Sequence, residues 1–209
     1  MVLVRELLPL GGHHLYDLLV GRPLRRFYTS LVSHIPPGLV LDVGCGPGHL
    51  ANAMQASGRQ VIGLDKDPRQ IRIAKRNHPK LDLCPGEAEA LPFVDNSFDA
   101  VVTSESFHHW QNRRAGLAEA FRVLKPGGQL LVIEGAGDVT RDEVTAFLGH
   151  RAPPGLTTII RWIFSIHGFG PQALAEELVS ALDDSPFGGC LVERHHGWWL
   201  VRATKPKSV

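Results

Sequence analysis

The sequence lacks the features that mark membrane, secreted and disulfide-rich proteins. No apolar run approaches the roughly 18 residues that a membrane-spanning helix needs. The N-terminus also lacks the charged segment and apolar segment of a signal peptide. The three cysteines, Cys45, Cys84 and Cys190, are odd in number and widely spaced, so they form neither a disulfide framework nor a zinc motif. We therefore expect a cytoplasmic protein without a metal site.

An excess of charge of one sign is also missing. Lys and Arg number 22 against 21 Asp and Glu, which gives a net charge of +1 at pH 7. This balance removes the usual electrostatic case for a nucleic-acid partner or an anionic membrane surface. What is present is a 209-residue chain, 44% hydrophobic and 21% charged, as expected for one globular domain with room for a small cap. Arg outnumbers Lys by 16 to 6, which indicates a GC-rich bacterial genome.

From residue 39 onward, short apolar runs alternate with stretches of helical pattern. Such alternation is typical of a parallel sheet with helices on both faces. The expected strands cover residues 39–43, 60–65, 81–84, 98–104 and 129–134, and the expected helices cover 49–57, 68–77 and 111–124. Two further runs, 189–194 and 198–204, flank a turn at 195–197 and predict a terminal hairpin with one antiparallel strand. The predicted fold class is therefore α/β, with a doubly wound, mostly parallel sheet.

The pattern differs on both sides of this region. Residues 1–38 predict one or two amphipathic helices, because the apolar residues between 24 and 35 follow a helical spacing. The alternation lapses at about 136–168, and a helix is expected over 171–182. We expect a domain over 39–209, with the N-terminal helices and the insert at about 136–168 covering its site. Within the insert, Trp162 and Phe164 either line a substrate pocket or pack the cap.

A glycine-rich loop follows the first expected strand, over residues 42–48. Glycines at 44, 46 and 48 let the backbone turn sharply and approach a ligand closely. In an open parallel sheet, ligands bind beyond the carboxyl ends of the strands. Asp65 ends the second expected strand, where a carboxylate can accept hydrogen bonds from both ribose hydroxyls. A dinucleotide and S-adenosylmethionine both fit these observations.

The details of the loop separate the two cofactors. Dinucleotide sites use the spacing G-x-G-x-x-G, whereas Gly48 comes one residue too early and His49 stands where the third glycine would be. Pro47 also removes an amide donor near the place of a pyrophosphate. The loop favours S-adenosylmethionine. A nicotinamide-dependent oxidoreductase and a non-catalytic S-adenosylmethionine-binding protein of the same fold stay open as alternatives.

Five segments in register resemble the class I S-adenosylmethionine-dependent methyltransferases. They are residues 41–48, 63–65, 86–93, 96–99 with 107–110, and 124–128. The resemblance is closest to the ubiquinone/menaquinone-methyltransferase-like branch. It implies a Rossmann-like sheet of seven strands with an antiparallel last strand, in agreement with the predicted hairpin. Residues 39–209 are then the methyltransferase domain.

The resemblance also implies how the first motif holds S-adenosylmethionine, whose product is S-adenosylhomocysteine. Gly44 and Gly46 would line the methionine part of the cofactor. Asp42 and Cys45 belong to the same motif and are expected beside the cofactor. The family has small residues at the position of Cys45, so we interpret its thiol as a packing group and not as a nucleophile.

The remaining cofactor residues come from the next three motifs, again as the resemblance implies. Asp65 would hold the ribose, and Lys66 would lie beside the adenine. Glu87, where the family usually has Asp, would face the adenine amino group, and Ala88 would offer its backbone amide to the ring. Ser104 would lie near the amino-acid part of the cofactor.

Residues 107–110, Phe-His-His-Trp, supply the candidate for proton transfer. An imidazole titrates near neutral pH, so it can take a proton from a hydroxyl during attack. The segment resembles the L-H-x-W stretch of plant small-molecule O-methyltransferases, whose general base matches His108. The alternative is a structural histidine at a helix start, and His109 is expected to point away. The apolar segment 156–169 favours a small, partly apolar substrate, and transfer to oxygen, nitrogen or carbon all fit.

Overall fold

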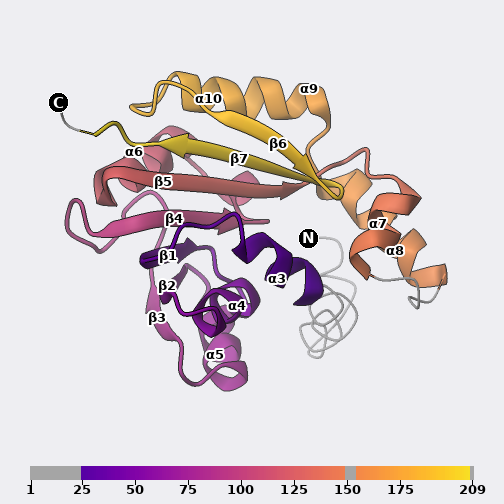
Figure 1. Ribbon diagram of the computed structural model, residues 1–209, viewed down its shortest axis with the longest axis horizontal. Helices are drawn as coiled ribbons and strands as arrows, with labels where there is room; N and C mark the ends of the chain where they lie inside the picture. Colours follow the sequence, from indigo (N-terminus) through magenta and orange to yellow (C-terminus); the bar gives the residue numbers. More distant parts are fainter. Residues whose placement is uncertain (1–24, 149–153, 208–209) are drawn as a thin grey trace.

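A computed structural model describes residues 25–148 and 154–207, which form a single seven-stranded sheet (Figure 1). The strand order is β3-β2-β1-β4-β5-β7-β6. The strands are β1 (Leu39–Val43), β2 (Gln60–Asp65), β3 (Asp82–Pro85), β4 (Phe98–Ser104), β5 (Leu124–Gly135), β6 (Leu191–His195) and β7 (Trp198–Thr204). Strands β1 to β5 pair in parallel, and β7 is antiparallel to β5 and β6. The predicted mostly parallel sheet with an antiparallel last strand is confirmed.

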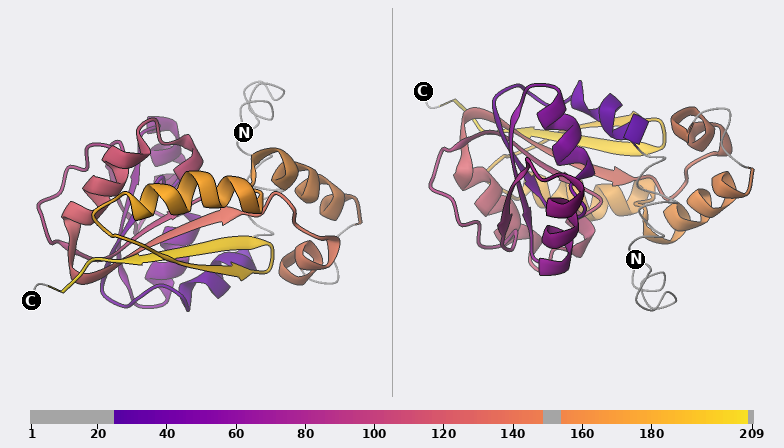
Figure 2. Two further views of the ribbon diagram at one scale, coloured as in Figure 1. Left: turned by 90° about the horizontal axis from the view of Figure 1, so that it is seen from above. Right: turned by 90° about the horizontal axis from the view of Figure 1, so that it is seen from below.

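Helices cover both faces of the sheet (Figure 2). Helices α3 (Arg25–Val32) and α4 (His49–Ala56) pack on one face, and α6 (Arg113–Val123) packs on the other with α10 (Ser180–Asp183). Helix α5 (Pro68–Asn77) lies against β2 and β3. Neighbouring strand residues serve opposite faces, because side chains alternate along a strand: Val40 joins the α3–α4 core and Leu41 joins the α6 core.

Two elements lie where the sequence predicted them, and residues next to each element explain its position. Helix α5 begins after Asp67, whose Oδ1 accepts a hydrogen bond from the Arg69 backbone N–H at 2.9 Å, with Pro68 at the first helical position. The predicted hairpin is also present. Its turn residues His196 and Gly197 both have positive φ, 47° and 80°, as a two-residue turn that matches strand twist requires.

Strand β5 corrects one expectation. It begins at Leu124 rather than at 129, so residues 125–128 belong to the strand and not to a turn before it. The pairing with β4 shifts register between Phe98 and Ala100, because Phe98 pairs with Leu124 and Ala100 pairs with Gln129. Gly127 supplies a left-handed φ of 81°, and Lys125 Nζ lies 2.7 Å from Asp99 Oδ1. The sequence indicated glycine and proline residues typical of a turn, but it did not show that β5 extends through them and pairs with β4 from Leu124.

One expected helix is confirmed and another is less regular than predicted. The helix expected over 111–124 is present as α6, and a 3₁₀ turn, η2 (Phe107–His109), precedes it. Asn112 separates the two and caps α6, accepting a hydrogen bond from the Ala115 N–H at 3.1 Å. The expected helix 171–182 consists of α9 (Pro171–Ala173), a π-helical segment η3 (Leu174–Val179) and α10.

The insert at 136–168 contains two helices, α7 (Arg141–Leu148) and α8 (Pro154–His167). They lie beyond the carboxyl ends of β4 and β5 in Figures 1 and 2. Phe164 is buried and meets Trp198 edge-on, with ring centroids 4.8 Å apart, whereas Trp162 is 50% exposed. Phe164 therefore packs the core. The helix expected in the first part of 1–38 lies outside the described residues, which begin at α3.

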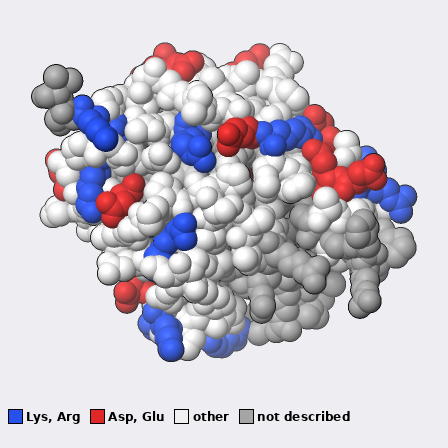
Figure 3. All heavy atoms as spheres, in the orientation of Figure 1, with Lys and Arg blue, Asp and Glu red and all other residues white. Residues whose placement is uncertain are grey.

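The charged side chains carry no dominant sign on the face shown in Figure 3. Lys and Arg lie interspersed with Asp and Glu there, as the net charge of +1 leads one to expect. Over residues 25–148 and 154–207, none of the helices has the length and apolar character needed to cross a membrane.

Candidate cofactor and active site

The glycine loop between β1 and α4 contains three left-handed residues. Gly44, Gly46 and Gly48 have φ of 75°, 53° and 82°, a conformation that costs L-residues with a Cβ about 1–2 kcal/mol each. The Gly44 N–H donates to the Leu64 carbonyl of β2 at 2.7 Å. A Cβ at Gly44 would overlap the Ser106 side chain, whereas a Cβ at Gly46 would meet nothing within 4 Å. The loop is thus packed at Gly44 and open at Gly46.

Asp65 joins the end of β2 to this loop. Its carboxylate is buried, with Oδ2 accepting a hydrogen bond from the Gly46 N–H at 2.9 Å and Oδ1 accepting one from the Asp67 N–H at 2.8 Å. A carboxylate has about four acceptor positions, so each oxygen can still accept a further hydrogen bond. The residue therefore fixes the loop and keeps the capacity to bind two hydroxyls.

The predicted adenine residues follow next to Asp65. The Gly86 N–H donates to the Asp65 carbonyl at 3.2 Å, which holds the segment after β3 beside the end of β2. Ala88 is buried in this segment, whereas Glu87 and Lys66 are exposed. The structure thus gathers the sequence-predicted residues of the second and third motifs at one edge of the sheet.

Two polar side chains at the carboxyl ends of β1 and β4 have buried atoms without a partner among the described residues. They are Asp42 Oδ2 and Ser104 Oγ. Burial raises the pKa of Asp42 to about 7, helped by the charge of Asp65 and opposed by a hydrogen bond from the Ala51 N–H. Because buried polar atoms are normally hydrogen-bonded, these two suit a ligand that brings polar groups to this edge.

Cys45 lies in the loop as a packing residue. It is 8% exposed, and its Sγ would lie 2.9 Å from a Cβ placed at Gly63 of β2. Burial raises the pKa of the thiol, with the charges of Asp42 and Asp65 acting in the same direction. A thiol held in its neutral form is a poor nucleophile, in line with the interpretation from the sequence. The described residues contain no cluster of His, Cys, Asp or Glu that could hold a metal ion.

His108 lies on η2, after the end of β4, and is held by Glu134 from β5. The His108 Nδ1 lies 2.8 Å from Glu134 Oε2, and Glu134 Oε1 accepts a hydrogen bond from the Phe107 N–H at 2.8 Å. Burial lowers the pKa of His108, but the hydrogen bond and charge of Glu134, together with the charge of Glu105, outweigh it. The pKa of His108 therefore lies above its ordinary value of 6.5.

Glu105 and Glu134 are site residues that sequence reasoning missed. Glu105 has an uncommon positive φ of 53° and accepts a hydrogen bond from the Gly135 N–H. Burial and then the charge of Glu134 raise the pKa of Glu105 to about 8. One signal could have found both residues. Each stands at the carboxyl end of a buried strand, as Asp65 does on β2.

The fold and the site together define a doubly wound α/β domain with a G-x-G-x-G loop and an acidic residue ending the second strand. Residues 41–132 match the model of the methyltransferase-domain family. The resemblance to methyltransferases noted in the sequence is confirmed.

Relatives match over the same region. The chain is 40% identical over 113 residues to a demethylmenaquinone methyltransferase of Renibacterium salmoninarum, covering 54% of this chain and 48% of that protein. It is 33% identical over 132 residues to the enzyme of the same name from Streptomyces avermitilis, covering 63% and 54%. The chain thus spans about half the length of these relatives.

Solved structures share the fold over most of the chain. A proposed S-adenosyl-L-methionine-dependent methyltransferase from Methanococcus maripaludis has a TM-score of 0.73 at 19% identity, covering 94% of this chain and 91% of that one. An S-adenosylmethionine-dependent methyltransferase from Aquifex aeolicus has a TM-score of 0.63 at 20% identity, covering 90% and 95%. At this identity the likeness concerns the fold, which is the Rossmann-like methyltransferase fold expected from the sequence.

Proposed function

We propose that this protein is an S-adenosylmethionine-dependent methyltransferase that acts on a small, partly apolar molecule. The observation that carries the proposal is the junction of Gly46 and Asp65. There, a loop open to a ligand is hydrogen-bonded at 2.9 Å to a carboxylate that retains free acceptor positions. The family match of residues 41–132 supports the same reaction.

The proposed cofactor residues form three groups, and each group would bind one part of S-adenosylmethionine. Gly44 and Gly46, with Asp42, Cys45 and Ser104 around them, would receive the amino-acid part. Asp65 would accept hydrogen bonds from the ribose hydroxyls. Lys66, Glu87 and Ala88 would surround the adenine. The buried atoms of Asp42 and Ser104 fit such a ligand, because its ammonium and carboxylate groups would satisfy them.

When bound, S-adenosylmethionine supplies a sulfonium methyl group that is already electrophilic. The protein therefore contributes mainly alignment and the exclusion of water. His108 would add a general base, taking the proton of a substrate hydroxyl onto its imidazole and releasing it to solvent afterwards. Glu134 holds Nδ1 of the ring, which fixes its orientation and stabilises the imidazolium that forms. Only the neutral imidazole can accept the proton, so the raised pKa of His108 moves the onset of activity to higher pH than an unperturbed imidazole would give.

The substrate is inferred from the surroundings of the site. Helices α7 and α8, beyond the carboxyl ends of β4 and β5, would cover the methyl-donor end together with the N-terminal helices of residues 1–38. Two relatives are named demethylmenaquinone methyltransferase, which favours a hydroxylated aromatic ring with an apolar substituent. We place the protein in the cytoplasm and expect no nucleic-acid partner, because the charges are balanced and the cysteines isolated.

Calorimetry with purified protein tests the cofactor assignment. S-adenosylmethionine and S-adenosylhomocysteine should bind, and NAD should not. A panel of phenols, naphthols and hydroquinones, with amines for comparison, then tests methyl transfer by mass spectrometry. Binding of NAD without S-adenosylhomocysteine would reject the proposal. Cofactor binding without transfer to any acceptor in the panel would favour a non-catalytic binder.

A further inference from the structure

The segment that would surround the adenine has almost no secondary structure of its own. Residues 86–97 connect β3 to β4, and among them only Glu87 and Ala90 form an isolated β-bridge. A connection of this kind has no ladder or helix to fix its backbone. Apart from its ends, where Gly86 and Asn96 make backbone hydrogen bonds to Asp65 and Arg122, its position must come from side chains of neighbouring elements.

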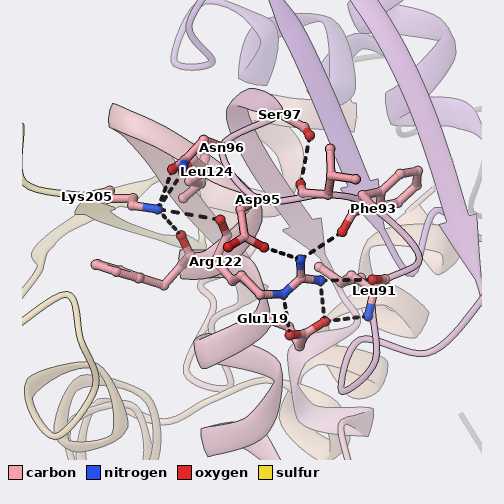
Figure 4. Close-up of polar contacts among 11 residues, drawn as sticks. Leu91, Phe93, Asp95, Asn96, Ser97, Glu119, Arg122, Leu124 and Lys205 are labelled. Atoms are coloured by element: carbon pink, nitrogen blue, oxygen red, sulfur yellow. Dashed lines mark hydrogen bonds and ion pairs between the residues drawn. The ribbon is translucent and has the colours of Figure 1, made fainter.

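Arg122, near the end of α6, supplies most of these contacts (Figure 4). Its Nη2 donates to the Leu91 carbonyl at 3.0 Å, and its Nη1 donates to the Phe93 carbonyl and to Asp95 Oδ1, each at 2.8 Å. One guanidinium thus binds the segment at three positions. The planar fork of five N–H groups permits this, whereas an ammonium group could not reach all three in one geometry.

Glu119, one turn earlier on α6, holds the guanidinium in place. Arg122 Nε donates to Glu119 Oε1 at 2.7 Å, and Nη2 donates to Oε2 at 2.8 Å. The same Oε2 accepts a hydrogen bond from the Leu91 N–H at 2.8 Å. The peptide groups around Leu91 are therefore bound on both sides by one Arg–Glu pair, as Figure 4 shows.

The segment is also held near both ends of α6. At the far end, the Asn96 N–H donates to the Arg122 carbonyl at 3.1 Å, and Lys205 Nζ donates to Asn96 Oδ1 at 2.9 Å. Nearer to Ala88, Glu89 Oε1 accepts a hydrogen bond from the Gln111 N–H at 2.8 Å. Helix α6 and the residue before its cap thus hold the segment at Asn96 and Glu89, and Arg122 binds its centre.

We propose that Arg122 is a positioning residue for recognition of the adenine base. This inference rests on the proposed function, because it takes Glu87 and Ala88 as the groups that would contact the base. Leu91 is buried and lies three residues after Ala88. Loss of the guanidinium would release Leu91 and Phe93, and the backbone at 87 and 88 would lose its fixed distance from Asp65. Arg122 is not among the residues that would contact the cofactor, so it would act through the segment that it binds.

The preference of the protein for adenine over another base can be measured, and a loss of folding stability alone would not change this preference. Calorimetry measures the binding of two compounds to wild type, Arg122→Ala and Arg122→Lys. The compounds are S-adenosylhomocysteine and S-inosylhomocysteine, and the second has a keto oxygen in place of the adenine amino group. Wild type should prefer the adenine compound. Arg122→Ala should bind S-adenosylhomocysteine at least tenfold more weakly and lose most of that preference. Arg122→Lys should fall between the two, because Lys restores the charge but not the fork.

Arg194 provides a matched control elsewhere in the chain. It also pairs with two carboxylates, Glu143 at 2.9 Å and Asp138 at 2.8 Å, and its side chain is 28% exposed against 31% for Arg122. Arg194→Ala should therefore lose a comparable ion-pair network while keeping the wild-type affinity and base preference. Should Arg122→Ala fail to fold, Glu119→Gln should lower the preference in part while keeping the Arg122 contacts to the carbonyls.

The outcomes separate this inference from the proposed function. If wild type binds S-adenosylhomocysteine and folded Arg122→Ala matches Arg194→Ala in affinity and in base preference, the positioning role is overturned. With Arg122→Ala unfolded, an unchanged preference in Glu119→Gln overturns it. If wild type binds neither compound, the proposed function fails and the inference fails with it.

Discussion

The Nδ1 of His108 lies 2.8 Å from Oε2 of Glu134, although the two residues are 26 positions apart in the chain. Parallel pairing of β4 with β5 brings them together, because Ser104 aligns with Ile133 and both strands end at the same edge of the sheet. Glu134 also binds the Phe107 N–H, so one carboxylate fixes both the backbone and the ring of η2. The dyad gives His108 a defined orientation after the end of β4.

The first prediction separates the two histidines by their effect on turnover. With a working substrate that carries a hydroxyl, His108→Ala should lower turnover by about 10²–10⁴ while cofactor affinity is retained. His109→Ala should have a small effect. Turnover and calorimetric affinity are measured side by side. Small, equal losses at both positions would show that neither histidine transfers the proton.

The pH profile of Glu134→Gln extends the same test. Glu134 contributes to the raised pKa of His108, so removing its charge should move the acidic limb of the turnover profile to lower pH. The maximal turnover should fall as well, since the ring loses a charged partner. An acidic limb that stays in place would assign it to a group other than His108.

The second prediction concerns Asp65. Asp65→Ala should weaken S-adenosylhomocysteine binding by about 1.5–3 kcal/mol, the usual worth of a hydrogen bond to a charged group. Part of the loss would come from the Gly46 N–H, which Asp65 also binds. Asp65→Asn should keep one acceptor and lose less. Unchanged affinity of Asp65→Ala in calorimetry would remove the basis for the ribose assignment.

The third prediction uses the difference between Gly44 and Gly46. At Gly46 an added Cβ meets nothing within 4 Å, so Gly46→Ala should cost only the left-handed strain of roughly 1–2 kcal/mol. Its S-adenosylhomocysteine affinity should nevertheless fall at least tenfold, because the methyl group enters the space beside the loop. Gly44→Ala should destabilise the protein more, since its Cβ overlaps Ser106. Urea unfolding and calorimetry together check both variants. A Gly46→Ala protein with full affinity would place the ligand elsewhere.

The fourth prediction is that stability falls as pH rises from about 5 to 8. Asp42 has its pKa raised from 3.8 to about 7, and Glu105 from 4.5 to about 8. Between the unfolded and the folded pKa of each carboxyl group, the folded state holds a proton that the unfolded chain has released. The free energy of unfolding therefore decreases as pH rises. The raised pKa of His108 acts in the same direction.

Three variants test this sign by thermal unfolding across that range. Asp42→Asn and Glu105→Gln should each flatten the decline. Glu143→Gln should leave the slope above pH 6 unchanged, because the pKa of Glu143 is lowered to about 2 and the residue is ionised there in both the folded and the unfolded state. Equal slopes in wild type and in the first two variants would contradict the prediction.

The fifth prediction concerns the insert at 136–168. If α7 and α8 cover the substrate, they should exchange amide hydrogens faster than β1 and β4 in the free protein, and slow down when S-adenosylhomocysteine and substrate are bound. Hydrogen exchange followed by mass spectrometry measures both. Exchange as slow as in those strands, with and without ligands, would argue for a structural role of the insert.

The sequence by itself determined the elements whose causes are local. Glycines at 44, 46 and 48 permit the left-handed loop, Asp67 and Pro68 start α5, and alternation of side chains defines the strands. The order of strands and helices follows from the same patterns. These features depend on backbone preferences and on neighbours within a few residues, so they can be read without knowing the rest of the chain.

Tertiary structure alone decided the electrostatic contacts and the exceptions to the pattern. Glu134 binds His108, Arg122 donates a hydrogen bond to the Leu91 carbonyl, and the pairing of β4 with β5 shifts register at residues 125–128. The raised pKa of Glu105 likewise needs burial and a carboxylate from another strand. Such effects depend on distances between residues far apart in sequence, which only the pairing of strands and the packing of helices on them can set.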